Sequence, residues 1–472
     1  MNRIDVLPDD ILLEIFDFCV GCTNHWEGKR IVEKWQSLVH VCRRWRSLVL
    51  ASPRRLNLRL FCTPRTPAKD TLDAWPALPL IVSTGRITEA FTQDTDQIIA
   101  ALGQSNRVCQ VDLYLAGWQM EQVLAAMQVP FPELTDLWLT SQGETMSVIP
   151  DSFLDRSAPR LRELIMGSIP FPGLPNLLLS ANHLVALGLI NIPHSGYFSP
   201  EAIVALLSVL SSLERFSIGF QSPQSRPDGE TRPPPSKRSV IPALTYLHFK
   251  GVIEYAEDLV TCIDTPQLDN LHITLFNQID FDIPQLAQFI NRTPKLWKPD
   301  AHVQFDDYSA CFRLQTTPGS RTIEIAIRCK ESDWQLSSIE QVCNSSLHHL
   351  SMAEDLYVEN PYDLQLEWKD GAIENTLWLQ LLRSFNAVKN LYLSEVFAPG
   401  IATALQELVG GRIMEVLPSL QNIFVERLRP SGLFQKNIGL FAAARQLSDH
   451  PIAISVWNTG RYIDTDTDAQ VA

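Results

Sequence analysis

The 472-residue sequence lacks any apolar run long enough to cross a membrane. Its longest apolar stretch, residues 177–192, is interrupted by Ser180, Asn182 and His183. At the N-terminus, Arg3 and Asp5 stand where the apolar core of a signal peptide would begin. We therefore expect a protein of the cytoplasm, the nucleus or both, with no membrane partner.

Cysteine and basic residues are also scarce. Nine scattered cysteines, an odd number, fit reduced thiols rather than a disulfide framework. The 39 Lys and Arg residues are outnumbered by 53 Asp and Glu, and the net charge of −14 disfavours nucleic acid as a partner. Residues 29–65 are locally basic, but we expect Trp35 and Trp45 there to lie on a buried helical face. That arrangement leaves no platform on which bases could stack.

Sequence motifs of known catalytic and metal sites are missing as well. We find no glycine-rich phosphate loop, no Gly-x-Ser-x-Gly and no His-Glu-x-x-His. One group near the N-terminus has the residue types of a zinc site: Cys19, Cys22, His25, His40 and Cys42. Structural zinc commonly uses two short-spaced ligand pairs, and only one is present, so we expect core thiols instead. The sequence predicts a protein without catalytic activity, metal or cofactor.

The first fifty residues contain two helical patterns of opposite charge. Pro8 followed by Asp9 and Asp10 suits a helix start, and apolar residues then recur at helical spacing, namely Ile11, Leu12, Ile15, Phe16 and Cys19. A second helical stripe ends at Ser52-Pro53 and comprises Trp35, Leu38, Cys42, Trp45 and Val49. A module this short cannot bury so many apolar groups, so we expect a partner-binding patch on its surface.

Residues 7–16 and 41–45 resemble the F-box, a three-helix motif. The continuation through residues 50–60 is similar to F-box proteins of mushroom-forming fungi. The resemblance covers about a tenth of the chain. The chain departs from a minimal F-box by an insertion around 21–30 and by Leu56-Asn57-Leu58, where a Leu-Trp pair is common. In that family the motif docks onto the acidic adaptor subunit of cullin-RING ubiquitin ligases. The implied adaptor-contacting residues are Leu7, Pro8, Ile11, Leu12, Ile15, Phe16, Val41, Cys42 and Trp45.

A motif with three apolar residues, ϕ-x-x-ϕ-x-ϕ, recurs through the rest of the chain. Ten copies begin at Val108, Leu134, Leu161, Leu184, Leu213, Leu244, Leu268, Leu347, Val388 and Leu420. The first seven starts lie 23 to 31 residues apart, and a gap of 79 then predicts two degenerate copies within 294–330. A short strand plus a helix at this period is the leucine-rich-repeat pattern. The alternative is a non-repeating α/β domain in which leucine runs coincide.

We therefore predict the α/β fold class: a small three-helix F-box followed by an irregular leucine-rich-repeat-like solenoid, or horseshoe, of parallel strands. Irregular curvature is expected because the Asn or Cys that usually follows each repeat strand is absent. The expected division is an F-box over 1–60, a proline-rich connector and first solenoid cap over 61–100, and the solenoid over 101–457. Within this division, residues 221–239 are predicted to be a mobile loop and 458–472 a flexible acidic tail.

These features predict the substrate-recognition subunit of an SCF-type ubiquitin ligase. It would bind the acidic adaptor, and through it a cullin, and hold an unknown protein substrate on the concave side of the solenoid. The residues expected on that side are Trp138, Glu163, Tyr246, His248, His272, His349, Tyr392 and Glu426. Two alternatives stay open: a repeat scaffold whose N-terminal helices only cap the solenoid and bury Leu7, and an enzyme with a deep polar pocket.

Overall fold

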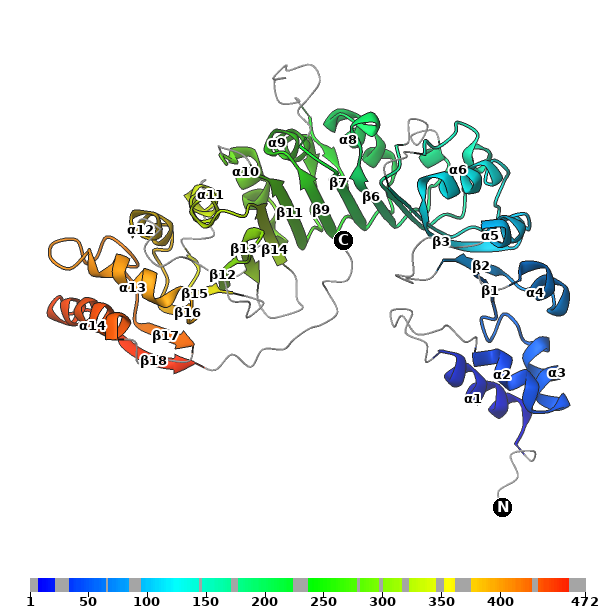
Figure 1. Ribbon diagram of the computed structural model, residues 1–472, viewed down its shortest axis with the longest axis horizontal. Helices are drawn as coiled ribbons and strands as arrows, with labels where there is room; N and C mark the ends of the chain where they lie inside the picture. The colour runs from blue at the N-terminus through cyan, green and yellow to red at the C-terminus, as the bar shows by residue number, and fades with distance from the viewer. Residues whose placement is uncertain are drawn as a thin grey trace. The chain divides into compact units, whose positions relative to one another are not determined.

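The computed structural model describes most of the chain, in thirteen stretches. They are residues 7–21, 34–64, 67–84, 95–143, 147–170, 177–223, 237–277, 281–296, 300–315, 322–344, 352–360, 375–426 and 432–457. None of the helices within these stretches is long and apolar enough to cross a membrane. The chain divides into two units, Met1–Ser222 and Pro223–Ala472, each with a sheet that carries helices on one face (Figure 1).

The first unit begins with helices α1 (Asp9–Gly21), α2 (Lys34–Val41) and α3 (Arg43–Ala51). The single helical stripe expected over residues 35–49 is wrong, because the chain leaves the helix at Cys42 (φ −157°, ψ 169°). The thiol of Cys42 caps α3 by accepting a hydrogen bond from the Trp45 amide, with Sγ and N 3.5 Å apart. Cys42 is therefore an exposed cap and not the core thiol we expected, and Trp45 is only half-buried.

A parallel sheet follows, with its seven strands in chain order. They are β1 (Leu60–Cys62), β2 (Leu80–Ser83), β3 (Val108–Ala116), β4 (Asp136–Gln142), β5 (Glu163–Gly167), β6 (Ala186–Ile192) and β7 (Arg215–Phe220). The connections contain α4 (Ala68–Ala74), α5 (Thr95–Leu102), α6 (Gly117–Ala126), α8 (Pro200–Val209) and the short 3₁₀ helices η2 (Phe153–Arg156) and η3 (His194–Gly196). The segment 61–100, expected to be a connector and cap, thus already contributes strands to this sheet.

Nine copies of the apolar motif, all except the one at Leu347, form strands in this way. In six of the nine the first apolar residue closes a tight turn, as when the Leu134 amide donates to the Phe131 carbonyl (3.2 Å) and Leu161 to Ala158 (3.1 Å). The second and third lie in the strand and are buried. Successive turns are joined by main-chain hydrogen bonds, because the Arg162 amide donates to Thr135 O and the Val185 amide to Arg162 O, each across 2.7 Å. These bonds satisfy backbone groups of the turns that lead into the strands.

The sheet of the second unit has the order β9-β11-β14-β13-β12-β15-β16-β17-β18. Its strands are β9 (Tyr246–Gly251), β11 (Asn270–Phe276), β12 (Asp300–Phe305), β13 (Ser309–Gln315), β14 (Thr322–Arg328), β15 (Asp355–Glu359), β16 (Asn390–Leu393), β17 (Asn422–Glu426) and β18 (Ala453–Trp457). The helices are α9 (Ile253–Cys262), α10 (Pro284–Arg292), η4 (Pro294–Leu296), α11 (Ser332–Asn344), α12 (Asn375–Arg383), α13 (Ala398–Gln406) and α14 (Gly432–Leu447). In Figure 1 these helices follow the outer face of the strands.

The prediction of two degenerate repeats within 294–330 is wrong. This segment forms β12, β13 and β14, of which β13 pairs antiparallel with both neighbours. Only three residues separate β12 from β13, too few for a repeat helix, and the Asp306 carboxylate closes that turn by accepting from the Tyr308 and Ser309 amides at 2.7 Å. The solenoid is therefore parallel except at this meander. Strand β14 pairs in parallel with β11, and β12 pairs in parallel with β15, so the sheet continues on both sides of the meander.

The repeat copy placed at Leu347 is also misassigned. Met352, its third apolar position, is 58% exposed and lies outside any strand. The strand of this repeat is β15, whose Leu356 and Val358 are buried and stand in register with Leu391 and Leu393. Ala353, fully buried, has the spacing of the first apolar residue, so the motif begins six residues later than expected.

Several expectations fall wholly or partly outside the described residues: the insertion around 21–30, Cys22 and His25 of the candidate zinc group, Leu347 and Leu350 of the eighth motif copy, His349, the acidic tail 458–472 and most of the loop 221–239. At the end of that loop Ser239 and Val240 are described, and they form strand β8 (Ser239–Val240), which pairs with β10 (Ile263–Asp264).

Candidate protein-interaction sites

Helix α1 has two apolar faces, and only one of them is buried. Leu12 and Phe16 are fully enclosed. Ile11, Ile15 and Phe18 follow one another at intervals of four and three residues, which places them on one side of the helix. Their exposed fractions are 44%, 42% and 75%. The single stripe expected on α1 is therefore split into a core face and a surface face, and Phe18 is a surface residue that we did not predict, although its spacing marks it.

The corner between α2 and α3 lies beside the first turn of α1. The Arg44 guanidinium donates to the Leu7 carbonyl (2.6 Å) and to Asp9 Oδ1 (2.5 Å). Val41 and Cys42, which immediately precede that arginine pair, are exposed. The structure thus brings the two separated segments together, with Pro8, Ile11, Ile15, Val41 and Cys42 on the surface. Leu7 is half-buried, and Trp45 is partly covered by Phe16, whose ring centroid is 4.8 Å away.

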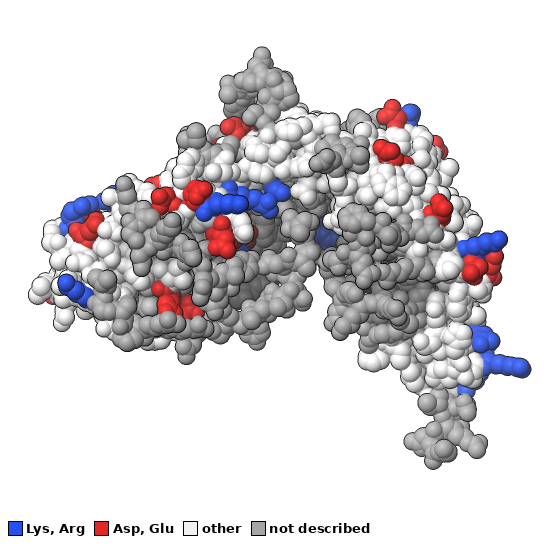
Figure 2. Space-filling model, viewed as in Figure 1, with Lys and Arg blue, Asp and Glu red and all other residues white. Residues whose placement is uncertain are grey.

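The N-terminal helices are joined to the sheet of the same unit through α2. Trp35 Nε1 donates to the Arg59 carbonyl (3.1 Å), and its ring packs edge-on against Trp75, with centroids 5.1 Å apart. Exposed arginines, including Arg43 and Arg46, surround this region, and Figure 2 shows basic side chains projecting from it at the lower right. The N-terminal helices thus expose basic side chains on α3, whereas the exposed charged side chains of α1 are all acidic.

In the first unit, Trp138 and Glu163 lie on the face of the sheet that carries no described helix. Trp138 is half-buried between Asp112 and Ile165 on the adjacent strands, and its indole N–H has no hydrogen-bond partner among the described residues. Glu163 forms an ion pair with Arg215 two strands away. Ala186 lies between them in register, and its small side chain leaves room for that pair.

In the second unit, the face of the sheet that carries no described helix has a cluster of polar rings on strands β9 and β11. The Tyr246 and His272 rings have centroids 5.3 Å apart, and His272 Nδ1 lies 3.8 Å from Glu324 Oε2. The same carboxylate accepts from Arg313 Nη2 at 2.7 Å. Burial, and next the charge of His272, lowers the pKa of His248 to about 4. This cluster contains three of the predicted substrate-facing residues, Tyr246, His248 and His272.

Further along the same face, four rings stack across neighbouring strands. We call His302, Tyr357, Tyr392 and Phe424 the aromatic row. Their successive centroid distances are 4.3, 4.2 and 4.6 Å, and the ring planes lie within 10° of parallel. Trp457 packs against Tyr392 at 5.2 Å. Only Tyr392 was predicted. Because side chains alternate along a strand, the sequence could have placed the other three rings on this face. Their stacking depends on the strand register, and the misassigned repeat at Leu347 gave the wrong strand for Tyr357.

The predicted residue Glu426 differs from the others because it is only 5% exposed. It stands beside Trp457 in the strand register. The expectation that Glu426 is presented to a partner is therefore not met in this arrangement of the protein.

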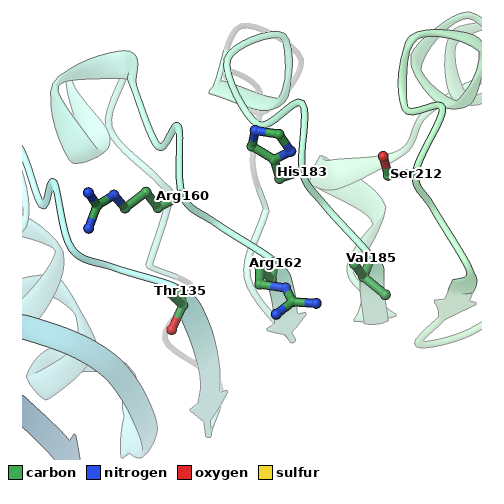
Figure 3. Close-up of a pocket in the computed structure, with 6 residues that line it drawn as sticks. All are labelled: Thr135, Arg160, Arg162, His183, Val185 and Ser212. Atoms are coloured by element: carbon green, nitrogen blue, oxygen red, sulfur yellow. The ribbon is translucent and has the colours of Figure 1, made fainter. Parts of the chain in front are cut away.

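A shallow hollow of about 430 Å³ is present in the first unit. It is lined by Thr135, Arg160, Arg162, His183, Val185 and Ser212, which belong to the turns leading into strands β4 to β7. Arg160 forms an ion pair with Glu133. Figure 3 shows that the six side chains point in different directions and do not converge on one point. The groups with shifted pKa values, such as His248 and Lys250, lie elsewhere.

The described residues contain no group of three or more His, Cys, Asp or Glu side chains suited to hold a metal ion. Every cysteine within the described ranges is a free thiol. Burial raises the pKa of the Cys311 and Cys343 thiols, which keeps them protonated near neutral pH.

Comparison with known proteins gives weak similarity only. No family model matches the sequence, and no curated protein matches it. Among solved structures, an internalin (InlF) from Listeria monocytogenes is 12% identical, with 83% of this chain and 89% of that chain covered and a TM-score of 0.29. The leucine-rich repeat-containing protein LegL7 from Legionella pneumophila is 11% identical, with 81% and 98% covered and a TM-score of 0.27. The arrangement of strands and helices described above independently defines an irregular α/β solenoid of leucine-rich-repeat type.

Proposed function

We propose that this chain is a non-catalytic substrate-recognition subunit of a cullin-RING ubiquitin ligase. The N-terminal helices would dock onto the acidic adaptor, which in turn contacts the cullin, and the solenoid would hold a protein substrate. Ubiquitin transfer would then depend on proximity, because the chemistry belongs to other subunits.

The observation that carries this proposal is the surface apolar face of α1. Ile11, Ile15 and Phe18 expose large apolar side chains, although the same helix already buries Leu12 and Phe16 against its neighbours. A contiguous apolar surface on a small module is typical of a binding site. The exposed Arg43 and Arg46 would complement an acidic adaptor.

The proposal is tested by co-purification of the full chain with the ligase adaptor subunit. We expect the parent to retain the adaptor and a variant carrying Ile11→Asp and Ile15→Asp to lose it. Truncating a central apolar anchor typically costs about 2 kcal/mol or more of binding energy, and a charge there costs at least as much. Since both side chains are partly exposed, the variant should still fold, and its thermal unfolding transition checks this.

Leu447→Asp is the matched control, because Leu447 is 89% exposed on helix α14, which belongs to the second unit. This variant should retain the adaptor. A folded parent that fails to bind the adaptor would overturn the proposal and favour the scaffold alternative, in which the N-terminal helices only cap the repeats.

A further inference from the structure

The strands that carry the aromatic row and Trp457 contain acidic residues and His302, but no lysine or arginine. Strands β12, β15, β16, β17 and β18 hold four carboxylates, namely Asp300, Asp355, Glu359 and Glu426, and no Lys or Arg. Each of the four lies on the face of the sheet that carries the aromatic row, because side chains alternate along a strand. Glu359 Oε2 lies 3.6 Å from His302 Nδ1 and Glu426 is buried, so the negative charge available to a partner on these strands is that of Asp300 and Asp355.

Two of these carboxylates face each other directly. Asp300 and Asp355 are register partners on neighbouring parallel strands. No described residue forms an ion pair with either of them. Burial, and then the charge of Asp355, raises the pKa of the Asp300 carboxyl. Like charges in this position destabilise a sheet, and a cation from outside the chain would relieve that cost.

Amide groups continue the same row of hydrogen-bond acceptors. Asn390 Nδ2 donates to Asp355 Oδ1, and Asn422 Nδ2 donates to Asn390 Oδ1, each across 2.8 Å. The parallel stacked rings beside them hold one another in place, so a partner that binds there would lose little entropy in ordering them. Tyrosine and tryptophan are also the aromatic side chains that best accommodate cations.

We propose that this acidic and aromatic strip binds an extended, Lys- and Arg-rich segment of a partner protein. The strip consists of Asp300, Asp355, Glu359, the aromatic row and Trp457. The five strands that carry it span roughly 19 Å at the usual strand spacing. An extended chain covers that distance with about six residues. The inference depends on the proposed function in one respect only: if the chain is a ligase subunit, the basic segment belongs to its substrate.

The test measures fluorescence anisotropy of labelled ten-residue peptides added to the full-length chain without any ligase subunit. One peptide alternates Lys and Arg with Ser and Gly, and its partner has Glu and Asp in place of the basic residues. We expect binding of the basic peptide only, weakening as salt is added. A variant with Asp300→Asn and Asp355→Asn should bind about tenfold more weakly, the loss expected from two weak ion pairs.

A variant with Asp73→Asn and Glu121→Gln makes the same change in net charge on exposed helical positions of the first unit. It should bind the basic peptide like the parent. Equal losses in the two variants would show a non-specific charge effect and overturn the proposal, as would no binding of the basic peptide or preferential binding of the acidic one. Adaptor binding is measured separately, so failure here leaves the N-terminal proposal standing, and the reverse also holds.

Discussion

The Arg44 guanidinium lies 2.5 Å from the Asp9 carboxylate and also donates to the Leu7 carbonyl at 2.6 Å. These two contacts join the start of α3 to the start of α1, and they hold the exposed corner formed by Val41 and Cys42 beside the first turn of α1. They therefore fix the shape of the surface that we propose contacts the adaptor.

Arg44→Gln should reduce adaptor affinity more than it reduces stability. Both side chains of the pair are more than one-third exposed, so the ion pair contributes about 1 kcal/mol or less to the free energy of unfolding. Affinity for the adaptor, measured by calorimetry, should fall several-fold while the unfolding midpoint barely moves. Arg55→Gln, which removes the ion pair with Glu14, is the control. Equal affinity for the two variants would contradict the prediction.

The pH dependence of stability should include a contribution from His248. Its pKa of about 4 in the folded chain is below the unfolded value of 6.5, because it is buried beside His272 and Lys250. The unfolded chain therefore binds more protons between these two values, and stability falls as pH decreases from 6.5 to 4. The loss should reach about 3 kcal/mol.

His248→Gln should flatten this slope, because glutamine does not titrate. Denaturant unfolding of both proteins at pH 7.5 and pH 4.5 measures the difference. If the parent and the variant lose the same free energy on acidification, His248 is not the group responsible.

Arg445 is fully buried on α14, and burial lowers its pKa. Its guanidinium donates to the Leu417 carbonyl at 2.7 Å and lies over the Phe441 ring. Arg445→Ala should destabilise the chain by about 3 kcal/mol, since it leaves a cavity and an unsatisfied carbonyl. Arg445→Met fills the cavity without the buried charge and should cost less. A larger loss for Met than for Ala in denaturant unfolding would refute this account.

Glu257 of α9 caps the neighbouring helix α10. Its carboxylate accepts from the Gln285 and Leu286 amides at 2.8 and 2.7 Å, just after Pro284. Glu257→Ala should therefore lower the free energy of unfolding by about 1 to 2 kcal/mol, as loss of a helix cap does. Glu257→Gln keeps an acceptor oxygen and should lose less. The two variants are compared by urea unfolding, and indistinguishable losses would show that the cap contributes little.

The repeat strands could be predicted because their apolar residues serve a local purpose, each closing a turn or facing a helix. Leu134 and Leu137 are examples. The meander was missed because its reversed strand, Ser309–Gln315, has apolar residues at alternate positions, a pattern that fits either strand direction. Its direction depends on the short turn at Asp306, a tertiary outcome that leucine spacing does not encode.

The candidate sites, too, could be predicted only in part from the sequence. Helical spacing identified Ile11 and Ile15 but could not say which apolar face of α1 would be buried, since that depends on how α2 and α3 pack. The stacking of Tyr357 on Tyr392 depends on strand register. A repeat assignment that is wrong by one residue, or by six as at Leu347, predicts a different register and therefore no stacking. Burial that shifts the pKa of His248 is likewise a property of packing rather than of sequence.

The meander also has a consequence for how the chain reaches this structure. In a regular solenoid each repeat adds to the one before it, so folding can spread along the chain one unit at a time. Here β15 pairs with β12, whereas β11 pairs with β14, so the two flanks meet only after all three meander strands have assembled. That assembly brings together residues far apart in sequence, which slows folding. The meander should therefore separate two regions of rapid, stepwise folding by one slower cooperative step.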